Sequence, residues 1–509
     1  MKHSKIALLV SAALFASFGA NAASTDNTAT VNQAGNTNLA TVTQTDESVD
    51  NIATIDQVGN GNAAHATQAR TSDTTATISQ TGNDNLGTVD QMDATETSTA
   101  SIDTIGNENK AYITQQLNNA DSASAAIIQV GDENTATIVQ DNADGAVSTI
   151  TQNSSGDTAT INNHWSDNAT ATISQNTGSD NHGTIYQESS DSATASLTQT
   201  GGANTGTINQ ETGNFSHDLG TDDTLATLSQ DGQGNDATIN QNAMHNMASV
   251  EQNGDGNFAT VTQNGESNAS TVMQTGTGHS ADITQNDLSN LANVTQTGSG
   301  NGLTLTQEGS DFGTGNTASV SQNGDNDTAS LSQNGNSNQV VIAQNTSSHD
   351  NNISVTQSGT LNYAGAATEL GGGSSITITQ AGTNNSVKNN ANANNYYGAD
   401  IGAGTYGANN TLVISQSGSD NTAYADASHD NSSVDIAQSG EFNDATVESW
   451  FGSDNDLYVS QTGDHHLADV YVVGGSMNAV SVTQTDSYNT ANVTSSGSNN
   501  LVTVTQGTM

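Results

Sequence analysis

Side-chain amides recur along this chain at a spacing that could form continuous hydrogen-bonded rows. Gln252 is followed by Asn257 five residues later and by Gln263 after six more, and Gln274 begins the next copy. A primary amide both donates and accepts, so stacked copies can each donate to one neighbour and accept from the other. The chemistry that this spacing suggests is structural: ladders of amides along a stack of repeats.

The residues around these amides alternate, which predicts a β-strand on each side of a turn. Val250 and Ala248 precede Gln252 at every second position, and the same alternation leads to Gln263. Residues 253–256 read Asn-Gly-Asp-Gly, and such residues tolerate the positive φ angles of a sharp reversal. One copy is therefore strand, turn, strand and loop, and its glutamines share the inward parity of Ala and Val.

The leading Gln recurs mostly at steps of 22 to 25 residues, which sets the fold class. Such a period matches one turn of a β-solenoid with two short strands, and adjacent turns then lie about 4.8 Å apart. We expect an all-β fold of about twenty strand-turn-strand repeats. Its two parallel sheets would face each other in an amyloid-like cross-β stack.

Composition excludes an ordinary globular core and several classes of function. Only 32% of the residues are hydrophobic and 4% aromatic, with no Pro or Cys, so backbone ladders rather than disulfides must supply stability. Five basic residues stand against 52 acidic ones, which argues against nucleic acid as a partner. Because basic residues are scarce and no catalytic constellation is found, we expect no enzyme activity and no cofactor.

Histidine pairs raise the question of a metal site. His465 and His466 beside Asp464 could bind a metal ion, but His466 and His279 each occupy the ladder place of Asn. Asp157 and Asp327 are substitutions of the same kind. We therefore interpret these residues as variants of the ladder and predict no metal site.

The N-terminus has the pattern of an export signal. Lys2 and Lys5 precede an apolar run over residues 6–18, and residues 20–22 read Ala-Asn-Ala, a small-residue cleavage site. We predict a signal peptide over residues 1–22 and a secreted mature chain. The apolar run is too short to span a bilayer and no other stretch comes close, so no transmembrane segment is expected.

The repeat changes character near residue 345. Gln322, Gln333 and Gln344 are spaced by eleven residues, which predicts an extra half repeat and a slip of phase. We expect repeats with leading and trailing Gln over residues 23–344, and repeats with leading Gln only over residues 345–509, including a loop insertion at 391–410. In the later repeats the trailing place is expected to hold Thr368, Ala391, Ala427, Ser449, Val472 and Ser495. The position four residues before the leading Gln holds a small residue in the early repeats, such as Ala248. In the later repeats it holds a larger one: Ile376, Leu412, Val434, Leu457, Val480 and Val502.

The unit resembles the S-x5-Q-x4-N-x5-Q repeat of curlin, the subunit of bacterial curli fibres. The resemblance covers essentially the whole mature chain, and several copies hold leading Gln, ladder Asn and trailing Gln together. The structural ladder residues that we predict are Gln33, Asn38, Gln44, Gln57, Asn62, Gln68, Gln80, Asn85, Gln91, Gln199, Asn204, Gln210, Gln252, Asn257, Gln263, Gln296, Asn301, Gln307, Gln416, Asn421, Gln484, Asn489 and Gln506.

The resemblance implies a structural subunit of an extracellular functional-amyloid fibre, a curli-like fimbria for biofilm matrix, cell adhesion and aggregation. It also implies self-association, with a nucleator subunit and an outer-membrane export pore as partners. The acidic balance is more like that of the major subunit. The chain departs from the family in its many repeats and in the short segment before its first ladder position, Asn27.

Two other functions fit an exported solenoid. Outward pairs such as Thr41/Thr43 and Thr260/Thr262 would form flat arrays like those of β-solenoid ice-binding proteins, although Thr also favours solvated strands. A non-polymerising surface adhesin is the second alternative. Because residues 27–33 and 501–506 are ladder strands without polar caps, we expect copies to join through such edges.

Overall fold

A computed structural model describes residues 24–93, 95–116, 120–211, 223–309, 314–389 and 396–507. Within these ranges the regular elements are β-strands, and no helix is long and apolar enough to cross a membrane. The chain divides into two compact units, Met1–His245 and Asn246–Met509. The signal peptide expected over residues 1–22 lies outside the described residues.

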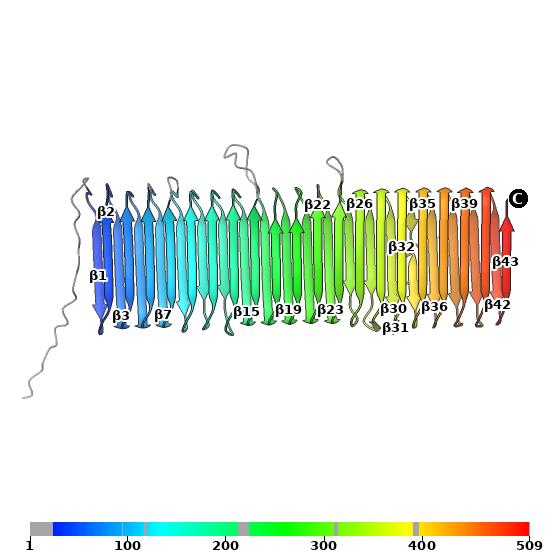
Figure 1. Ribbon diagram of the computed structural model, residues 1–509, viewed down its shortest axis with the longest axis horizontal. Coiled ribbons are helices and arrows are strands. Elements are labelled where there is room, and N and C mark those ends of the chain that lie inside the picture. The colour runs from blue at the N-terminus through cyan, green and yellow to red at the C-terminus, as the bar shows by residue number, and fades with distance from the viewer. Residues whose placement is uncertain are drawn as a thin grey trace, which may run out of the picture. The chain divides into compact units, whose positions relative to one another are not determined.

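Each turn of unit 1 contributes one strand to each of two parallel sheets. Sheet 1a consists of β1 (Thr28–Ala34), β3 (Ile52–Asn60), β5 (Thr75–Asn83), β7 (Thr99–Asn107), β9 (Ser124–Val130), β11 (Val147–Gln152), β13 (Thr170–Gln175), β15 (Thr194–Gly202) and β17 (Leu225–Gln233). Sheet 1b consists of β2 (Leu39–Thr45), β4 (Ala63–Ala69), β6 (Leu86–Met92), β8 (Lys110–Gln116), β10 (Thr135–Asp141), β12 (Thr158–His164), β14 (His182–Glu188), β16 (Thr205–Glu211) and β18 (Asp236–Gln241). The strands of the two sheets point in opposite directions (Figure 1).

Unit 2 repeats this arrangement. Sheet 2a consists of β19 (Met247–Asp255), β21 (Ala269–Thr277), β23 (Leu291–Ser299), β25 (Thr317–Gln322), β27 (Gln339–Gln344), β30 (Tyr363–Glu369), β33 (Ser386–Val387), β34 (Ala403–Tyr406), β36 (Thr422–Ser428), β38 (Asp444–Trp450), β40 (Leu467–Val473) and β42 (Thr490–Ser496). Sheet 2b consists of β20 (Phe258–Gln263), β22 (Ser280–Asn286), β24 (Gly302–Glu308), β26 (Thr328–Asn336), β29 (Asn352–Thr360), β32 (Ser375–Thr383), β35 (Thr411–Ser419), β37 (Ser433–Glu441), β39 (Asp456–Asp464), β41 (Ala479–Ser487) and β43 (Leu501–Gln506). Two short strands that lie between the main strands of successive turns also pair: β28 (Ser348–His349) and β31 (Gly371–Gly372).

Strands of successive turns pair in register, so equivalent residues lie side by side. Ile55 of β3 pairs with Ile78 of β5, and Gln57 pairs with Gln80. Ala53, Ile55 and Gln57 are at most 1% exposed, because every second side chain points between the two sheets. The two units hold about 20 turns of roughly 23 residues, so the predicted β-solenoid with two facing parallel sheets is confirmed.

Glycines stack at the turns because the adjacent backbone leaves no room for a Cβ atom. Gly82 has a φ of 127°, in the region that favours glycine. A Cβ atom on Gly82 would lie 1.8 Å from the carbonyl oxygen of Gly106 in the next turn. The close stacking of turns therefore depends on glycine at this place.

The phase of the repeat changes in unit 2 between β26 and β29, as the eleven-residue spacing predicted. Gln333 of β26 pairs with Gln357 of β29 in sheet 2b. Gln344 of sheet 2a pairs instead with Thr368. The leading glutamines from Gln357 onward thus continue the row that trailing glutamines form earlier in unit 2, and sheet 2a loses its glutamine row from Thr368.

The insertion near residue 391 falls within a strand of sheet 2a, and not in a turn between two strands. Both β33 and β34 pair with β30: Ala364 pairs with Val387, and Thr368 pairs with Thr405. Ala391, expected at the trailing place, lies outside the described residues, and Thr405 is the residue that pairs with Thr368. The expected insertion over residues 391–410 includes β34, which belongs to sheet 2a. The halves of this strand are separated by residues without alternation, so the sequence pattern does not join them.

Candidate functional site

Glutamine amides form hydrogen-bonded rows in the interior of unit 1. Nε2 of Gln57 donates to Oε1 of Gln80 in the next turn at 2.8 Å, and also to the carbonyl oxygen of Leu39 in the facing sheet at 3.1 Å. Each such amide therefore links its own strand to a neighbour in the same sheet and to a strand across the interior. Leaving a buried amide of this kind without a partner costs about 1 to 3 kcal/mol.

The predicted glutamines of unit 1 lie on two such rows, one in each sheet. Donor–acceptor distances between the amides described here are 2.6 to 3.0 Å. The glutamine row of sheet 1a is interrupted at Thr104. That of sheet 1b is interrupted at Asn163, whose Nδ2 donates to Ser148 Oγ at 3.1 Å. The row of sheet 1a includes Gln33, Gln57, Gln80 and Gln199, and that of sheet 1b includes Gln44, Gln68, Gln91 and Gln210.

Unit 2 contains the longest row. In sheet 2b every step from Gln263 to Gln506 is an amide-to-amide hydrogen bond of 2.8 to 3.0 Å. In sheet 2a a similar row runs from Gln252 to Gln344 at 2.8 to 2.9 Å. The remaining predicted glutamines of this unit fall on these rows: Gln296 in sheet 2a, and Gln307, Gln416 and Gln484 in sheet 2b.

Asparagines form separate rows at the turns. Oδ1 of Asn62 accepts from the backbone N–H of Asn85 at 3.0 Å, and Nδ2 of Asn62 donates to the carbonyl oxygen of Gly82 at 2.9 Å. The side-chain amide of each such Asn thus accepts a hydrogen bond from the backbone of the following turn through its oxygen and donates one to it through its nitrogen. The other predicted asparagines also lie at turns and donate to backbone carbonyl oxygens; they are Asn38, Asn85, Asn204, Asn257, Asn301, Asn421 and Asn489.

Histidine reproduces this asparagine geometry at two turns. Nδ1 of His279 accepts from the backbone N–H of Asn301 at 3.3 Å, and Nε2 lies 3.3 Å from the carbonyl oxygen of Thr275. His466 makes the equivalent contacts with Asn489 and Thr462. An imidazole can do both only when neutral, since protonated Nδ1 cannot accept. Burial lowers the pKa of His279, which favours the neutral form.

A family model for the curlin associated repeat matches residues 50–82, 221–254, 254–286, 348–382 and 430–463. The chain is a curlin-like repeat protein. The matched segments lie in both units and contain ladder residues described above, among them Gln57, Gln252 and Gln357. The curlin repeat therefore coincides with the stacked turns of the solenoid. No curated protein matches the chain.

Aspartate replaces asparagine at two turns of the solenoid, and a serine hydroxyl donates to each carboxyl group. Oδ1 of Asp157 accepts from the backbone N–H of Asn181 at 2.9 Å, and its Oδ2 accepts from Ser154 Oγ. Asp327 is paired in the same way with Ser348 Oγ. Burial raises the pKa of both carboxyl groups, and their hydrogen bonds oppose that rise.

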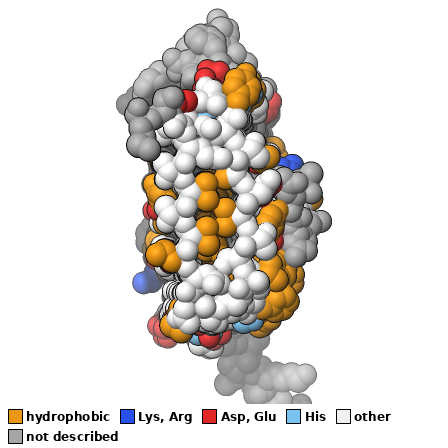
Figure 2. Space-filling model, turned by 90° about the vertical axis from the view of Figure 1, so that its right-hand side faces the viewer, with side chains coloured by type: hydrophobic (Ala, Val, Ile, Leu, Met, Phe, Trp, Pro, Cys, Tyr) orange, Lys and Arg blue, Asp and Glu red, His pale blue; other side chains and the backbone are white. Residues whose placement is uncertain are grey.

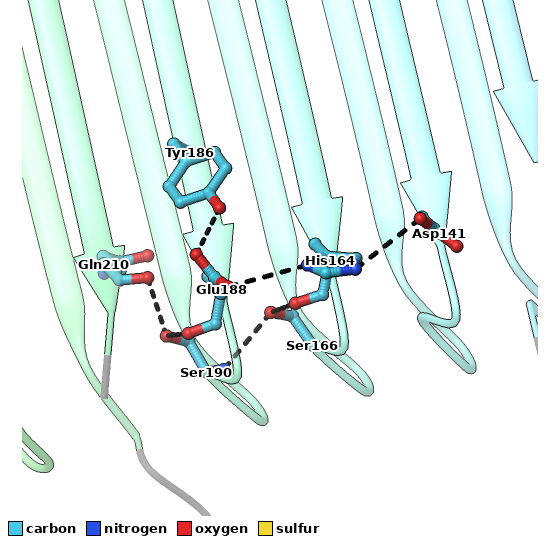
Figure 3. A network of polar contacts seen from close by, with 7 residues as sticks. All are labelled: Asp141, His164, Ser166, Tyr186, Glu188, Ser190 and Gln210. Atoms are coloured by element: carbon cyan, nitrogen blue, oxygen red, sulfur yellow. Dashed lines mark hydrogen bonds and ion pairs between the residues drawn. The ribbon is translucent and has the colours of Figure 1, made fainter. Parts of the chain in front are cut away.

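A row of ionisable side chains on the outward face of sheet 1b was not predicted from the sequence. Asp141, His164 and Glu188 pair in register, and the imidazole nitrogens lie 3.6 Å from Asp141 and 3.7 Å from Glu188 (Figure 3). The hydroxyl of Tyr186 donates to Glu188. Burial, with a smaller effect of Glu188, raises the pKa of Tyr186 to about 12. Asp141, His164 and Glu188 each come one residue after the trailing ladder position, and this shared position is the sequence signal that could have revealed the row.

Proposed function

We propose that the chain is a structural subunit of an extracellular, curli-like functional-amyloid fibre that builds biofilm matrix and supports cell adhesion and aggregation. The observation that carries this proposal is the unbroken amide row from Gln263 to Gln506 in a parallel, in-register sheet of curlin repeats. Stacked identical amides with every backbone group paired to the turns above and below are the structural basis of cross-β fibres. The curlin-repeat family is structural and non-enzymatic.

Each turn offers nearly the same surface to the next, which supports self-association by continued stacking. Figure 2 looks onto β42 and β43, where a narrow band of apolar side chains runs between broad polar borders. Between stacked turns the inward Val480 and Val482 of β41 are at most 2% exposed. A turn from a second copy that pairs in the same register would bury the same band and extend the same amide rows.

Export and partners follow from the same proposal. A signal peptide over residues 1–22 would direct the chain to the periplasm, from which an outer-membrane pore would pass it to the cell surface. A curli-type nucleator subunit is the expected partner for the start of a fibre. The formal net charge of −47 disfavours nucleic acid as a partner.

The outward threonines support the fibre more than ice binding. Thr41 pairs with His65, and Thr260 pairs with Asp282, so charged or bulky side chains interrupt these rows. A flat, regular threonine array is the feature that an ice-binding face would need. Interrupted rows are what strands on a solvated face normally show.

The proposal is tested by incubating the purified chain from residue 23 onward and examining it by electron microscopy with thioflavin fluorescence. Unbranched, thioflavin-positive fibres are expected. The same samples are measured for thermal hysteresis. A chain that stays monomeric and shows thermal hysteresis would replace the fibre proposal with ice binding, and a monomer without hysteresis would favour the adhesin.

A further inference from the structure

Tyr397, which precedes β34 in the chain, covers part of the outward face of sheet 2a in unit 2. A Cβ atom on Gly404 would lie 2.0 Å from the ring of Tyr397, so this glycine lets the tyrosine lie flat against β34. The hydroxyl of Tyr397 donates to Oδ1 of Asp426 at 3.0 Å. Consequently Asp426 and Glu448, which point outward from their strands, are only 1% and 2% exposed.

A cavity of about 320 Å³ lies beside this cover, and most of its wall is aromatic. The ring of Tyr396 stands nearly perpendicular to three others: at 85° to Tyr397 and Tyr406 and at 90° to Trp450, with centroids 5.0 to 6.5 Å apart. Phe451 completes the aromatic lining. Tyr396 thus packs edge-to-face with these rings, and the cavity is bounded by aromatic rings in more than one orientation.

Carboxylates lie at one side of the same cavity. Asp426 lines it and pairs in register with Glu448 on the adjacent strand, whose Oε2 accepts from Trp450 Nε1 at 2.7 Å. Two neighbouring buried carboxyl groups are costly unless positive charge offsets them. Within the described residues, the buried Nδ1 of His429, which also lines the cavity, and the hydroxyl of Tyr424 have no hydrogen-bond partner. The cavity wall therefore holds, at Nδ1 of His429, a polar atom that has no partner among the described residues.

We propose that this cavity binds a small organic ammonium ion, with Tyr396, Tyr406 and Trp450 around the alkyl groups and the carboxylate of Asp426 beside the charge. The faces of aromatic rings attract cations, and boxes of several rings suit alkylated ammonium groups. The ring faces suit an alkylated cation better than a bare metal ion, which needs several oxygen or nitrogen ligands. A sugar would instead need one flat, open ring. This binding goes beyond the fibre role and belongs to the single chain.

The test uses tryptophan fluorescence, because Trp165 and Trp450 are the chain's two tryptophans. In a Trp165→Phe background, Trp450 alone reports on the cavity. Choline is the probe, and 3,3-dimethylbutan-1-ol, which has the same shape without the charge, is the matched control. Saturable binding of choline, at least tenfold tighter than that of the neutral compound, is expected. Equal binding of both compounds, binding of glucose instead of choline, or no saturation with choline would overturn the proposal.

Variants separate binding from folding. Asp426→Asn and Tyr406→Ala should each weaken choline binding at least tenfold, whereas Thr494→Ala, on an exposed part of β42, should leave it unchanged. Circular dichroism checks that each variant keeps its strands. A folded Asp426→Asn or Tyr406→Ala variant that binds choline as tightly as the parent would overturn the proposal. A parallel titration with phosphatidylcholine vesicles shows whether the ammonium group is accepted from a lipid headgroup as well as from the free ion.

Proton release gives a second measurement. Burial, together with the carboxylates of Glu448 and Glu369, raises the pKa of Asp426 to about 8, while the hydrogen bond from Tyr397 opposes this rise. Tyr424 on the same strand also faces this carboxyl, and Tyr406 and His429 line the cavity around it. A bound cation favours the ionised carboxylate, so binding at pH 7 should release a proton. Calorimetry in two buffers of different ionisation enthalpy measures this release; none from the parent chain would contradict the role of Asp426, and Asp426→Asn should show none.

Discussion

Nε2 of Gln285 lies 2.9 Å from Oε1 of Gln307, the equivalent amide one turn further along sheet 2b. Gln285 also accepts from Gln263 at 2.9 Å and donates to the carbonyl oxygen of Ala269 in the facing sheet at 3.0 Å. One side chain thus holds three turns in register and joins the two sheets. The stacking of curlin repeats here depends on side chains as well as on backbone pairing.

Gln285→Ala should destabilise the surrounding turns by about 2 to 4 kcal/mol, since it leaves buried amide groups without partners and opens a cavity. Long repeat arrays do not unfold as one two-state unit, so hydrogen exchange of β20, β22 and β24 is the suitable measurement. Thr284→Ala, on the outward face of the same strand, is the matched control and should change protection by less than about 0.5 kcal/mol. Equal protection in both variants would mean that the amide row contributes little.

Most of the fold could be predicted because its signals are local. Alternation and the Gln–Asn–Gln spacing give the strands, the turns and the inward direction of the glutamines. The pairing of Gln333 with Gln357 could not be assigned, because glutamine rows in both sheets have the same parity and spacing. The cavity depends on Tyr397 lying against Gly404, a contact within an irregular segment that no periodic pattern encodes.

His279 should make its region of unit 2 sensitive to acid. Its pKa is lowered by burial, so the unfolded chain takes up a proton before the folded chain does. The stabilising contribution of neutral His279 is therefore complete above about pH 6.5 and is lost as the pH falls through the lower, folded value. His279→Asn keeps the turn contacts without a titrating group. The difference in hydrogen exchange between the two proteins should widen from pH 7.5 to pH 5; a constant difference would contradict this role.

In the interior of unit 1, Gly206 of sheet 1b lies close to side chains of sheet 1a, so a larger residue at 206 would compete with them for space. A Cβ atom on Gly206 would lie 2.6 Å from Leu197 Cδ1 and 3.1 Å from Gln230 Oε1. Gly206→Val should therefore overpack the interior, at a cost of about 1 to 3 kcal/mol. The loss in the double variant with Gln230→Ala should be smaller than the sum of the two single losses, as the late repeats combine a larger residue such as Leu412 with a small one opposite. Strictly additive losses in a double-mutant cycle would show that the two places are independent.

Acidic side chains should slow the association of subunits. Asp84, Glu108 and Glu133 lie at equivalent places in successive turns of unit 1, as their backbone hydrogen bonds to the preceding turn show. Other outward acids, such as Asp231, Asp255, Glu266 and Asp325, add to this charge. Salt near 0.15 M shortens the screening length to about 8 Å, and acid near pH 4 protonates part of the carboxylates, so either should speed fibre growth. A growth rate that stays the same between about 10 and 300 mM salt would argue against this repulsion.

Subunits should join by continuing the stack of turns, and X-ray diffraction from aligned fibres can measure the direction of that stack. Stacked turns are spaced about 4.8 Å apart, and the stacking direction would coincide with the fibre axis. A sharp reflection near about 4.8 Å is expected along that axis, with the sheet-to-sheet spacing at right angles to it. A reflection near about 4.8 Å perpendicular to the fibre axis would rule out continued stacking, because the solenoids would then lie across the fibre and associate through their sides.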